Sequence, residues 1–574
     1  MTDFASLFYN APETYSYVYI AILRWVVPVL ASFLLFRCIR SLLTFRREPE
    51  IWGWLHLSNG KTETLTHWEN IIGRSPNSEV VVDISTVSRI HAVLTRYDDG
   101  SWSIADADSK DGVYLNGKRI SSLQPVEEDD VITVGGVDMI LQPISAKQEK
   151  RQAQLRTKAS SVTASLTNTL LLSVLQLMFC IAYLFSAQPE SAKSVVMGFG
   201  GLMLCQWVLL LFYICIRRTS FEVENIAFFL CTMGMCVIAA VAPDEAFKQL
   251  VAMVLGIILF LIVGWSMRVL DRAEKFRYLA AIAGIGFLLI TMLFGTEYYG
   301  AKNWLIIGGM SLQPSELSKV CFVYIGAAPM AKIVTRKNIL AFIAYSVAIC
   351  GCLAVMNDFG TALIFFCAFL VIAYMRSGNM GTLALACTAL VFAAVVALKI
   401  APHALQRFAS WRHIWEDPLD TGHQQTRALM CMASGGILGL GPGNGLMKGI
   451  FAADSDVAVA TLTEEWGIVM LILVILSIVS LAIFCVRSAA VGRGSFYVIG
   501  ACTAASILLV QVILNALGTV DVVPLTGVTF PFLSNGGSGM MGAWGLLAFV
   551  KAADTRQNAS FAVRLIDGRG EADE

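Results

Sequence analysis

Long apolar stretches dominate this sequence and limit its possible folds more than any other feature. About thirteen runs of roughly 17–25 residues are long and apolar enough to cross a bilayer as helices. They lie near residues 17–36, 166–186, 194–216, 225–242, 248–267, 277–294, 312–331, 338–356, 359–375, 380–400, 461–486, 495–517 and 532–552. Of the 574 residues, 56% are hydrophobic and 15% are charged, whereas soluble domains carry about 25% charged residues. The sequence therefore predicts a polytopic all-α membrane protein.

The distribution of basic residues predicts the orientation of the chain. Arginines follow the first span, and further basic clusters occur at 217–218, 268–277, 332–337, 376 and 487–493. If the chain alternates through the spans, all of these fall on one side, and an excess of Lys and Arg marks the cytoplasmic side. The long loop 401–460 then lies outside. Because 42 Lys and Arg residues balance 42 Asp and Glu residues, no nucleic-acid partner is expected.

Residues 51–144 are polar and rich in turn signals. Short β-type runs occur at 79–82 and 131–134, and glycine-containing turn sequences separate the runs of this segment. The pattern predicts a small all-β domain on the cytoplasmic side. The other expected parts are an N-terminal membrane anchor (1–50), a charged linker (145–164), two additional transmembrane helices (165–220), a membrane core (221–553) and a cytoplasmic tail (554–574).

Three motifs of the β domain stand in a fixed order: Gly73–Ser75, Ser88–His91 and Asp111–Gly117. Their order and spacing resemble the forkhead-associated (FHA) domain, a phosphothreonine-binding β-sandwich. A phosphate requires a guanidinium and short hydroxyl or amide donors that converge on one loop edge. The resemblance implies that Arg74 and Ser88 hold the phosphate, that Arg89 assists and that His91 braces the loop.

Two residues depart from the FHA pattern. The family usually has Asn at the position of Asp111, where it contacts the backbone of the bound peptide, and Thr or Ser at the position of Lys110. A carboxylate close to a phosphate opposes binding. The expected outcome is weak or altered phosphothreonine binding with Asp111 in the site, and the alternative is a purely structural domain.

A second set of motifs lies in the membrane core. In chain order these are Gly300–Trp304, Leu312–Glu316, Asp358–Thr361, Glu416–Pro418, Gln424, Gly435–Gly441 and Pro524–Ser538. Together they resemble the SEDS family (shape, elongation, division and sporulation) of FtsW/RodA/SpoVE-type cell-wall polymerases. The implied fold is a SEDS-like ten-helix core whose large external loop is 401–460.

The resemblance implies a peptidoglycan glycosyltransferase that polymerises lipid II, the undecaprenyl-linked disaccharide pentapeptide, into glycan strands. It implies a bacterial plasma-membrane protein with an extracytoplasmic active site and a role in elongation, cell division or sporulation. The expected partners are lipid II, a class B penicillin-binding protein transpeptidase and, through the FHA domain, a phosphothreonine protein. A divalent cation, Mg²⁺ or Mn²⁺, is a candidate cofactor, and no organic cofactor is expected.

Asp456 is the predicted catalytic residue. The family's aspartate precedes a Glu-Glu pair by eight residues, and counting back from Glu464 gives Asp456. A sugar hydroxyl that attacks an anomeric carbon requires a carboxylate base, which the aspartate would supply. Asp454 is the rival base, and Asp456 could alternatively serve only as the N-cap of the following span.

The leaving lipid pyrophosphate requires positive charge, which Lys319, Arg407, Lys448 or a divalent metal could supply. The other predicted substrate-binding residues are Glu316, Asp358, Gln424, Glu464 and Ser534. Simpler interpretations stand beside these: Glu316 and Lys319, spaced i,i+3, could form a buried structural ion pair, and Asp358 could brace a hairpin. The glycines of 439–445 predict a tight turn and not a dinucleotide-binding loop.

Two other functional classes are compatible with the sequence. Many spans with intramembrane ionisable residues also describe a lipid-precursor flippase or transporter, although no inverted repeat between halves supports it. The third class is a catalytically silent scaffold that recruits a partner according to phosphorylation. The loop before Asp456 is shorter than in the family and Asn535 replaces a tyrosine, differences that could tune the partner or mark a divergent or inactive member. The polymerase is favoured because the motifs converge on one external site.

Overall fold

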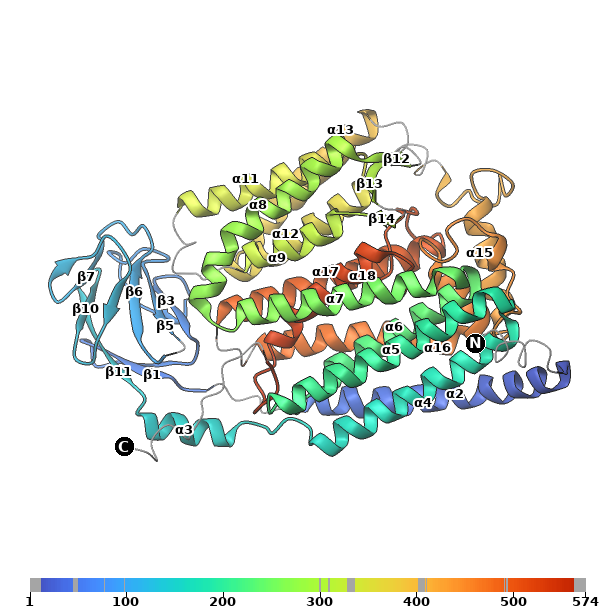
Figure 1. The fold of residues 1–574 in the computed structure, drawn as a ribbon. Helices are drawn as coiled ribbons and strands as arrows, with labels where there is room; N and C mark the ends of the chain where they lie inside the picture. Colours follow the sequence, from blue (N-terminus) through green and yellow to red (C-terminus); the bar gives the residue numbers. More distant parts are fainter. Residues whose placement is uncertain are drawn as a thin grey trace.

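The structure is a computed structural model that describes residues 12–44, 50–76, 78–97, 99–298, 301–307, 310–327, 336–400, 408, 410–489, 491 and 494–561. A bundle of long helices makes up most of the molecule, and a β-sandwich lies at one end of it (Figure 1). We call the opposite end, where helix α15 (His423–Gly435) and strands β12 to β14 lie, the distal end.

Ten helices of the described chain are long and apolar enough to cross a membrane. They are α2 (Glu13–Leu43), α4 (Val162–Ser186), α5 (Pro189–Cys215), α6 (Glu222–Val241), α7 (Ala246–Met267), α8 (Leu270–Phe294), α11 (Arg336–Val355), α12 (Phe359–Ser377), α16 (Ala458–Ala489) and α17 (Ser495–Thr519). The three other predicted spans contain α9 (Ser315–Gly326), α13 (Met380–Ile400) and α18 (Gly537–Ala552), which are not among these ten; α9 and α18, with 12 and 16 residues, are shorter than the spans predicted there. The prediction of a polytopic α-helical membrane protein is confirmed.

The predicted all-β domain is also confirmed, as a sandwich of two sheets. One sheet has the strand order β2-β1-β11-β10-β7-β8 and the other β4-β3-β5-β6-β9. The strands are β1 (Gly53–Leu57), β2 (Thr62–Leu65), β3 (Glu69–Gly73), β4 (Val80–Val81), β5 (Ala92–Arg96), β6 (Trp102–Asp106), β7 (Val113–Leu115), β8 (Lys118–Arg119), β9 (Gln124–Val126), β10 (Val131–Val134) and β11 (Val137–Pro143). Buried and exposed residues alternate along β11, as they do in a sheet with one face toward a core.

The linker after the sandwich forms the helix α3 (Ala146–Leu155), which begins with a capping box of Ser145 and Gln148. Arg156, just after this helix, forms an ion pair with Glu50 through two contacts. One of them joins Arg156 Nη2 to Glu50 Oε2 at 2.9 Å. The backbone N–H of Gln557 donates to the carbonyl of Thr157 at 3.0 Å. The linker is thereby joined to the segment that follows α18.

A buried ionic cluster connects the helices at the sandwich end of the bundle. Lys551 Nζ lies 3.1 Å from Glu224 Oε2, and Tyr213 Oη donates to the other oxygen of that carboxylate at 2.7 Å. Ser41 Oγ of α2 donates to Glu222 Oε1 at 2.5 Å. Helices α2 and α5, which precede the predicted core, are thus fixed to α6 by contacts with buried carboxylates, whose charges require such partners.

Candidate functional site

The predicted catalytic aspartate lies in the turn immediately before α16, at the distal end. Asp456 is partly exposed. Asn515 Nδ2 of α17 donates to the backbone carbonyl of Asp456 at 2.9 Å and to that of Val528 at 2.8 Å. Gly527 has φ +69°, and a Cβ added there would lie 3.5 Å from Asp456 Oδ2. The carboxylate therefore lies directly against the segment Pro524–Phe532, which carries the C-terminal motif.

The rival base, Asp454, is held by Asn535. The side-chain amide of Asn535 donates to Asp454 Oδ2 and to Glu245 Oε2, both at 2.7 Å, and its backbone N–H donates to the Asp454 carbonyl. Ser534 is buried, and its hydroxyl donates to the Ser455 carbonyl at 2.6 Å. Ser534 and Asn535 thus fix the turn that presents Asp456. Asn535 was noted from the sequence only as a departure from the family, and its bridging contact was not predicted.

Asp358 lies on the other side of the segment Pro524–Phe532. A Cβ added to its neighbour Gly360 would lie 3.0 Å from Val528 Cγ2. Asp358 Oδ1 accepts from the Thr361 N–H at 3.1 Å, which caps α12. Its Oδ2 accepts from the side-chain amides of Asn303 and Gln313 at 3.2 and 3.3 Å. The motifs that contain Asn303, Gln313 and Asp358 therefore meet at the buried Asp358 carboxylate. These contacts match the simpler interpretation, in which Asp358 braces the structure.

A small sheet that sequence reasoning missed supports this region. It has the order β12-β13-β14, from strands β12 (Thr296–Tyr298), β13 (Ala301–Ile307) and β14 (Met310–Leu312). The run Leu305-Ile306-Ile307 beside a glycine pair was the available strand signal.

Glu316 and Lys319 form a buried ion pair at the start of α9, with 2.6 Å between Oε1 and Nζ. Lys319 has no exposed surface and Glu316 is 4% exposed. This geometry matches the structural-pair interpretation. Contact of either residue with a substrate requires the pair to open.

Glu464 and Glu465 hold the glycine-rich part of the external loop against α16. The two oxygens of Glu464 accept from the backbone N–H groups of Leu446 and Met447 at 2.8 and 3.0 Å. Glu465 accepts from the Gly443 N–H at 3.0 Å and from Tyr183 Oη at 2.6 Å. Both carboxylates are buried. Tyr183 belongs to α4, and nothing in the sequence pattern pointed to this contact.

The glycine-rich run packs as a tight turn, as predicted. Gly439 has φ +81°, and a Cβ there would lie 2.0 Å from the Glu465 carbonyl oxygen. Gly467 interrupts α16 with φ +79°. Only glycine fits both positions, because a side chain would collide with the facing backbone.

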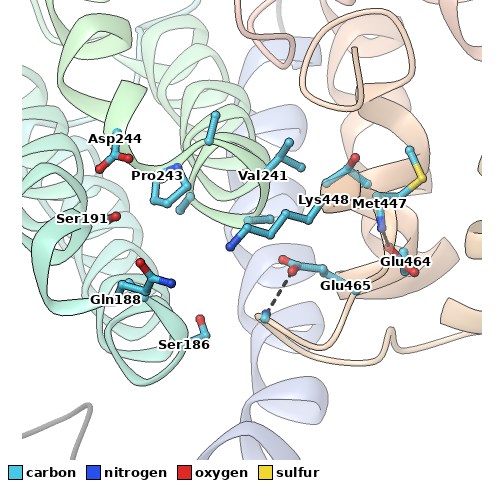
Figure 2. A pocket seen from close by; sticks show the side chains of 17 residues that line it. Ser186, Gln188, Ser191, Val241, Pro243, Asp244, Met447, Lys448, Glu464 and Glu465 are labelled. Carbon is cyan, nitrogen blue, oxygen red and sulfur yellow. Dashed lines mark hydrogen bonds between the residues drawn. The ribbon is translucent and has the colours of Figure 1, made fainter. Parts of the chain in front are cut away.

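The three remaining loop residues lie in different places. Lys448 is on the short helix η2 (Met447–Gly449), is exposed, and lines a cavity of about 240 Å³ together with Glu464 and Glu465 (Figure 2). Gln424 of α15 donates its side-chain amide to the Phe451 carbonyl at 3.0 Å. Arg407 lies outside the described residues.

The phosphothreonine motifs meet at one edge of the sandwich. The Arg74 N–H donates to the Ser88 carbonyl at 2.9 Å, and the Lys110 N–H donates to Ser88 Oγ at 3.2 Å. His91 is fully buried: its Nδ1 accepts from the Ser88 N–H at 3.0 Å and its Nε2 lies 3.1 Å from the Gly112 carbonyl oxygen. His91 therefore braces both loops. Arg74, Arg89 and Asp111 are exposed.

Within the described parts of the chain, no group of three or more His, Cys, Asp or Glu side chains is arranged to hold a metal ion. The carboxylates of Asp454 and Glu245 share one amide donor, but they do not by themselves make a ligand set. No step of the chemistry is therefore derived through a divalent cation.

Comparisons with known proteins match two parts of the chain. The model of the FtsW/RodA/SpoVE family, described as "Cell cycle protein", matches residues 241–558, and the FHA domain model matches residues 70–135. A peptidoglycan glycosyltransferase RodA of Mycobacterium tuberculosis is 28% identical over 325 residues, which cover 53% of this chain and 69% of that protein. A probable peptidoglycan glycosyltransferase FtsW of Bacillus subtilis is 30% identical over 336 residues, covering 54% and 83%.

Solved structures resemble the same two parts. A chain from the structure "Structural coordination of polymerization and crosslinking by a peptidoglycan synthase complex" covers 58% of this chain and 96% of its own length, with 23% identity and a TM-score of 0.49. A domain from a study of phosphothreonine-dependent FHA domain interactions covers 16% of this chain and 98% of its own length, with 27% identity and a TM-score of 0.16.

Proposed function

The chain belongs to the FtsW/RodA/SpoVE family of cell cycle proteins and carries an FHA domain, and from this premise we propose that it polymerises lipid II into glycan strands. The proposed reaction takes place at the outer face of the cytoplasmic membrane of a bacterium. The relatives named above are peptidoglycan glycosyltransferases. The sandwich would then lie in the cytoplasm, where protein kinases act.

The observation that carries this proposal is the position of Asp456. Its turn is fixed by Asn515 and Ser534, its carboxylate lies beside Gly527, and the residue keeps partial exposure. A general base must reach the hydroxyl whose proton it removes while being held in a defined geometry. Asp454 lies in the same turn, and Asn535 donates to one of its oxygens. In the proposed reaction, Asp456 accepts the proton of the acceptor sugar hydroxyl as the new glycosidic bond forms.

Positive charge for the departing pyrophosphate is the second requirement. Among the lysines singled out from the sequence, Lys448 is exposed at the distal end, whereas Lys319 is buried against Glu316. Lys448, however, lines a cavity together with Asp244, Glu464 and Glu465, whose carboxylates disfavour a pyrophosphate there, and we therefore propose Arg407 of the same external loop for this role. Mg²⁺ or Mn²⁺ is proposed as a candidate cofactor and is included in the assay.

The test compares purified wild type with Asp456→Asn and with the matched control Asp454→Asn. Each is incubated with lipid II and Mg²⁺ or Mn²⁺, with and without a class B penicillin-binding protein, and glycan polymer is read on a gel. Polymer from wild type and Asp454→Asn but not from Asp456→Asn is the expected result. Polymer from Asp456→Asn contradicts the assigned base. No polymer from wild type under any condition favours the transporter or scaffold alternatives.

The FHA domain is proposed to bind a phosphothreonine protein and so to link polymerisation to a threonine kinase. Arg74, Arg89 and Ser88 converge on one exposed loop edge, and this arrangement supports the proposal. The test is binding of a phosphothreonine peptide by the full-length protein in detergent. Arg74→Ala should abolish binding, and equal affinity for the phosphorylated and unphosphorylated peptides would contradict the proposal.

A further inference from the structure

A cavity of about 240 Å³ lies at the distal end, between the helices that precede the family core and the external loop. Its walls are the junction of α4 with α5, the short helix η1 (Pro243–Glu245) and the loop residues around Lys448 (Figure 2). Helices α4 and α5 lie outside the family match at 241–558, so this chain builds the cavity with residues beyond the family core.

Two opposite charges line this cavity from different walls. Lys448 extends across it toward the wall that contains Gln188 and Pro243, and Asp244 lies on the η1 wall (Figure 2). Neither side chain forms an ion pair or a hydrogen bond with the residues that the structure describes. A ligand that complements this arrangement carries both a negative and a positive group.

Uncharged polar side chains line the wall that is formed by the start of α5. Ser191, in the first turn of α5, is only 6% exposed, its hydroxyl has no partner among the described residues, and it faces the cavity. Its oxygen is accessible from the cavity and can both donate to and accept from a group bound there. The Gln188 amide, at the N-terminus of the same helix, adds both a donor and an acceptor.

The buried carboxylates that line the cavity disfavour the binding of a purely anionic ligand. The oxygens of Glu464 and Glu465 are already engaged by N–H and O–H donors of the protein. The carboxylates of Glu464 and Asp244 alone outnumber the single ammonium of Lys448. Pyrophosphate would therefore meet net repulsion here.

We propose that this cavity binds the end of a short peptide that carries both a free ammonium and a free carboxylate group. Lys448 and the Ser191 hydroxyl donate to the peptide carboxylate, while Asp244 and the Gln188 carbonyl accept from the peptide ammonium. The inference rests on the proposed function, since a peptide-bearing glycan precursor is the source of such a group at this face. The site is distinct from Asp456, which does not line the cavity.

The test measures binding directly, by saturation-transfer NMR and competition on the full-length protein in detergent. The probes are the unprotected dipeptide alanyl-alanine, its N-acetyl form, its C-terminal amide and inorganic pyrophosphate. Each is tested on wild type, Lys448→Met, Asp244→Asn and Ser191→Ala. Lys193→Met is the matched control, because Lys193 is an exposed lysine of α5 that does not line the cavity.

The expected result is that only the unprotected dipeptide binds wild type and Lys193→Met. Lys448→Met and Asp244→Asn should each weaken it about tenfold, as for the loss of one charge-assisted hydrogen bond. Binding of pyrophosphate in preference to the dipeptide, or dipeptide binding that is unchanged in both variants, overturns the inference. Binding is measured without turnover, so the two proposals can fail separately. If the dipeptide does not bind but polymerisation still depends on Asp456, the proposed function stands and the cavity assignment fails. If the dipeptide binds as expected but no Asp456-dependent polymer forms, the cavity assignment stands and the proposed function fails.

Discussion

Replacing Glu464 by glutamine separates a structural role from a substrate-binding role for this residue. In the structure its two oxygens accept from the N–H groups of Leu446 and Met447 at 2.8 and 3.0 Å, and the side chain is fully buried. Glutamine keeps the size but offers only one acceptor, so its amide N–H₂ must face one of the two backbone donors. One charge-assisted hydrogen bond is lost and one N–H is left buried without a partner.

The size of the effect follows from that loss. A hydrogen bond to a charged group contributes about 1.5–3 kcal/mol. Local opening of the loop at these amides should therefore become about 10- to 150-fold more frequent, since each 1.4 kcal/mol is a factor of ten. Hydrogen–deuterium exchange of a peptide containing Leu446 and Met447 measures this opening. Polymer yield on the gel should fall in parallel, because the same loop segment leads into the turn that carries Asp456.

The control is Glu416→Gln, which alters a glutamate of the same loop that is 76% exposed and pairs, among the described residues, with His413. It should leave exchange and polymerisation unchanged. If Glu464→Gln reduces polymerisation while the exchange of Leu446 and Met447 stays at the wild-type rate, the bracing interpretation is refuted. A direct contact of Glu464 with the substrate would then explain the loss.

Four further outcomes are expected. His91→Ala removes the partner of two buried backbone groups, at a cost of about 1–3 kcal/mol, and should weaken phosphothreonine-peptide binding in a titration. Asp111→Asn removes a carboxylate beside the phosphate position and should raise that affinity; an unchanged dissociation constant argues against its place in the site. Gly467→Ala places a Cβ 2.2 Å from the Ile437 carbonyl oxygen at φ +79° and should lower Tm in detergent, whereas Gly449→Ala, with open space around it, should not. Lys319→Met leaves the buried Glu316 carboxylate without its partner and should lower the free energy of unfolding by about 3–5 kcal/mol. Adding Glu316→Leu in the same chain should restore much of the lost Tm.

Much of the architecture could be predicted because its signals are local. Each span is a continuous apolar run, and the hydrophobic effect acts on such a run wherever it lies in the chain. The sandwich followed from β-type runs between turn residues, and the two motif sets named their families. The sheet β12-β13-β14 was missed because three short strands in a mainly apolar context give little periodicity.

The roles of the polar residues were less predictable. The sequence grouped Glu316, Lys319, Asp358 and Glu464 as substrate-binding candidates, yet the structure shows each of them buried and engaged with protein partners. A sequence motif indicates that a charged residue is required at a position, but it does not show which groups that residue contacts. Burial separates the partly exposed Asp456 from these buried groups.

By itself, the sequence determined the order of the apolar helices, the presence of the β domain and the family of the core, because hydropathy and motif spacing are properties of neighbouring residues. Only the tertiary structure decided that Tyr183 reaches Glu465, 282 residues away, and that Asn535 joins Asp454 to Glu245. It also decided that α4 and α5 close a cavity over the external loop. Such contacts depend on how helices pack, and packing is set by the shapes of side chains that meet only after the whole bundle has assembled.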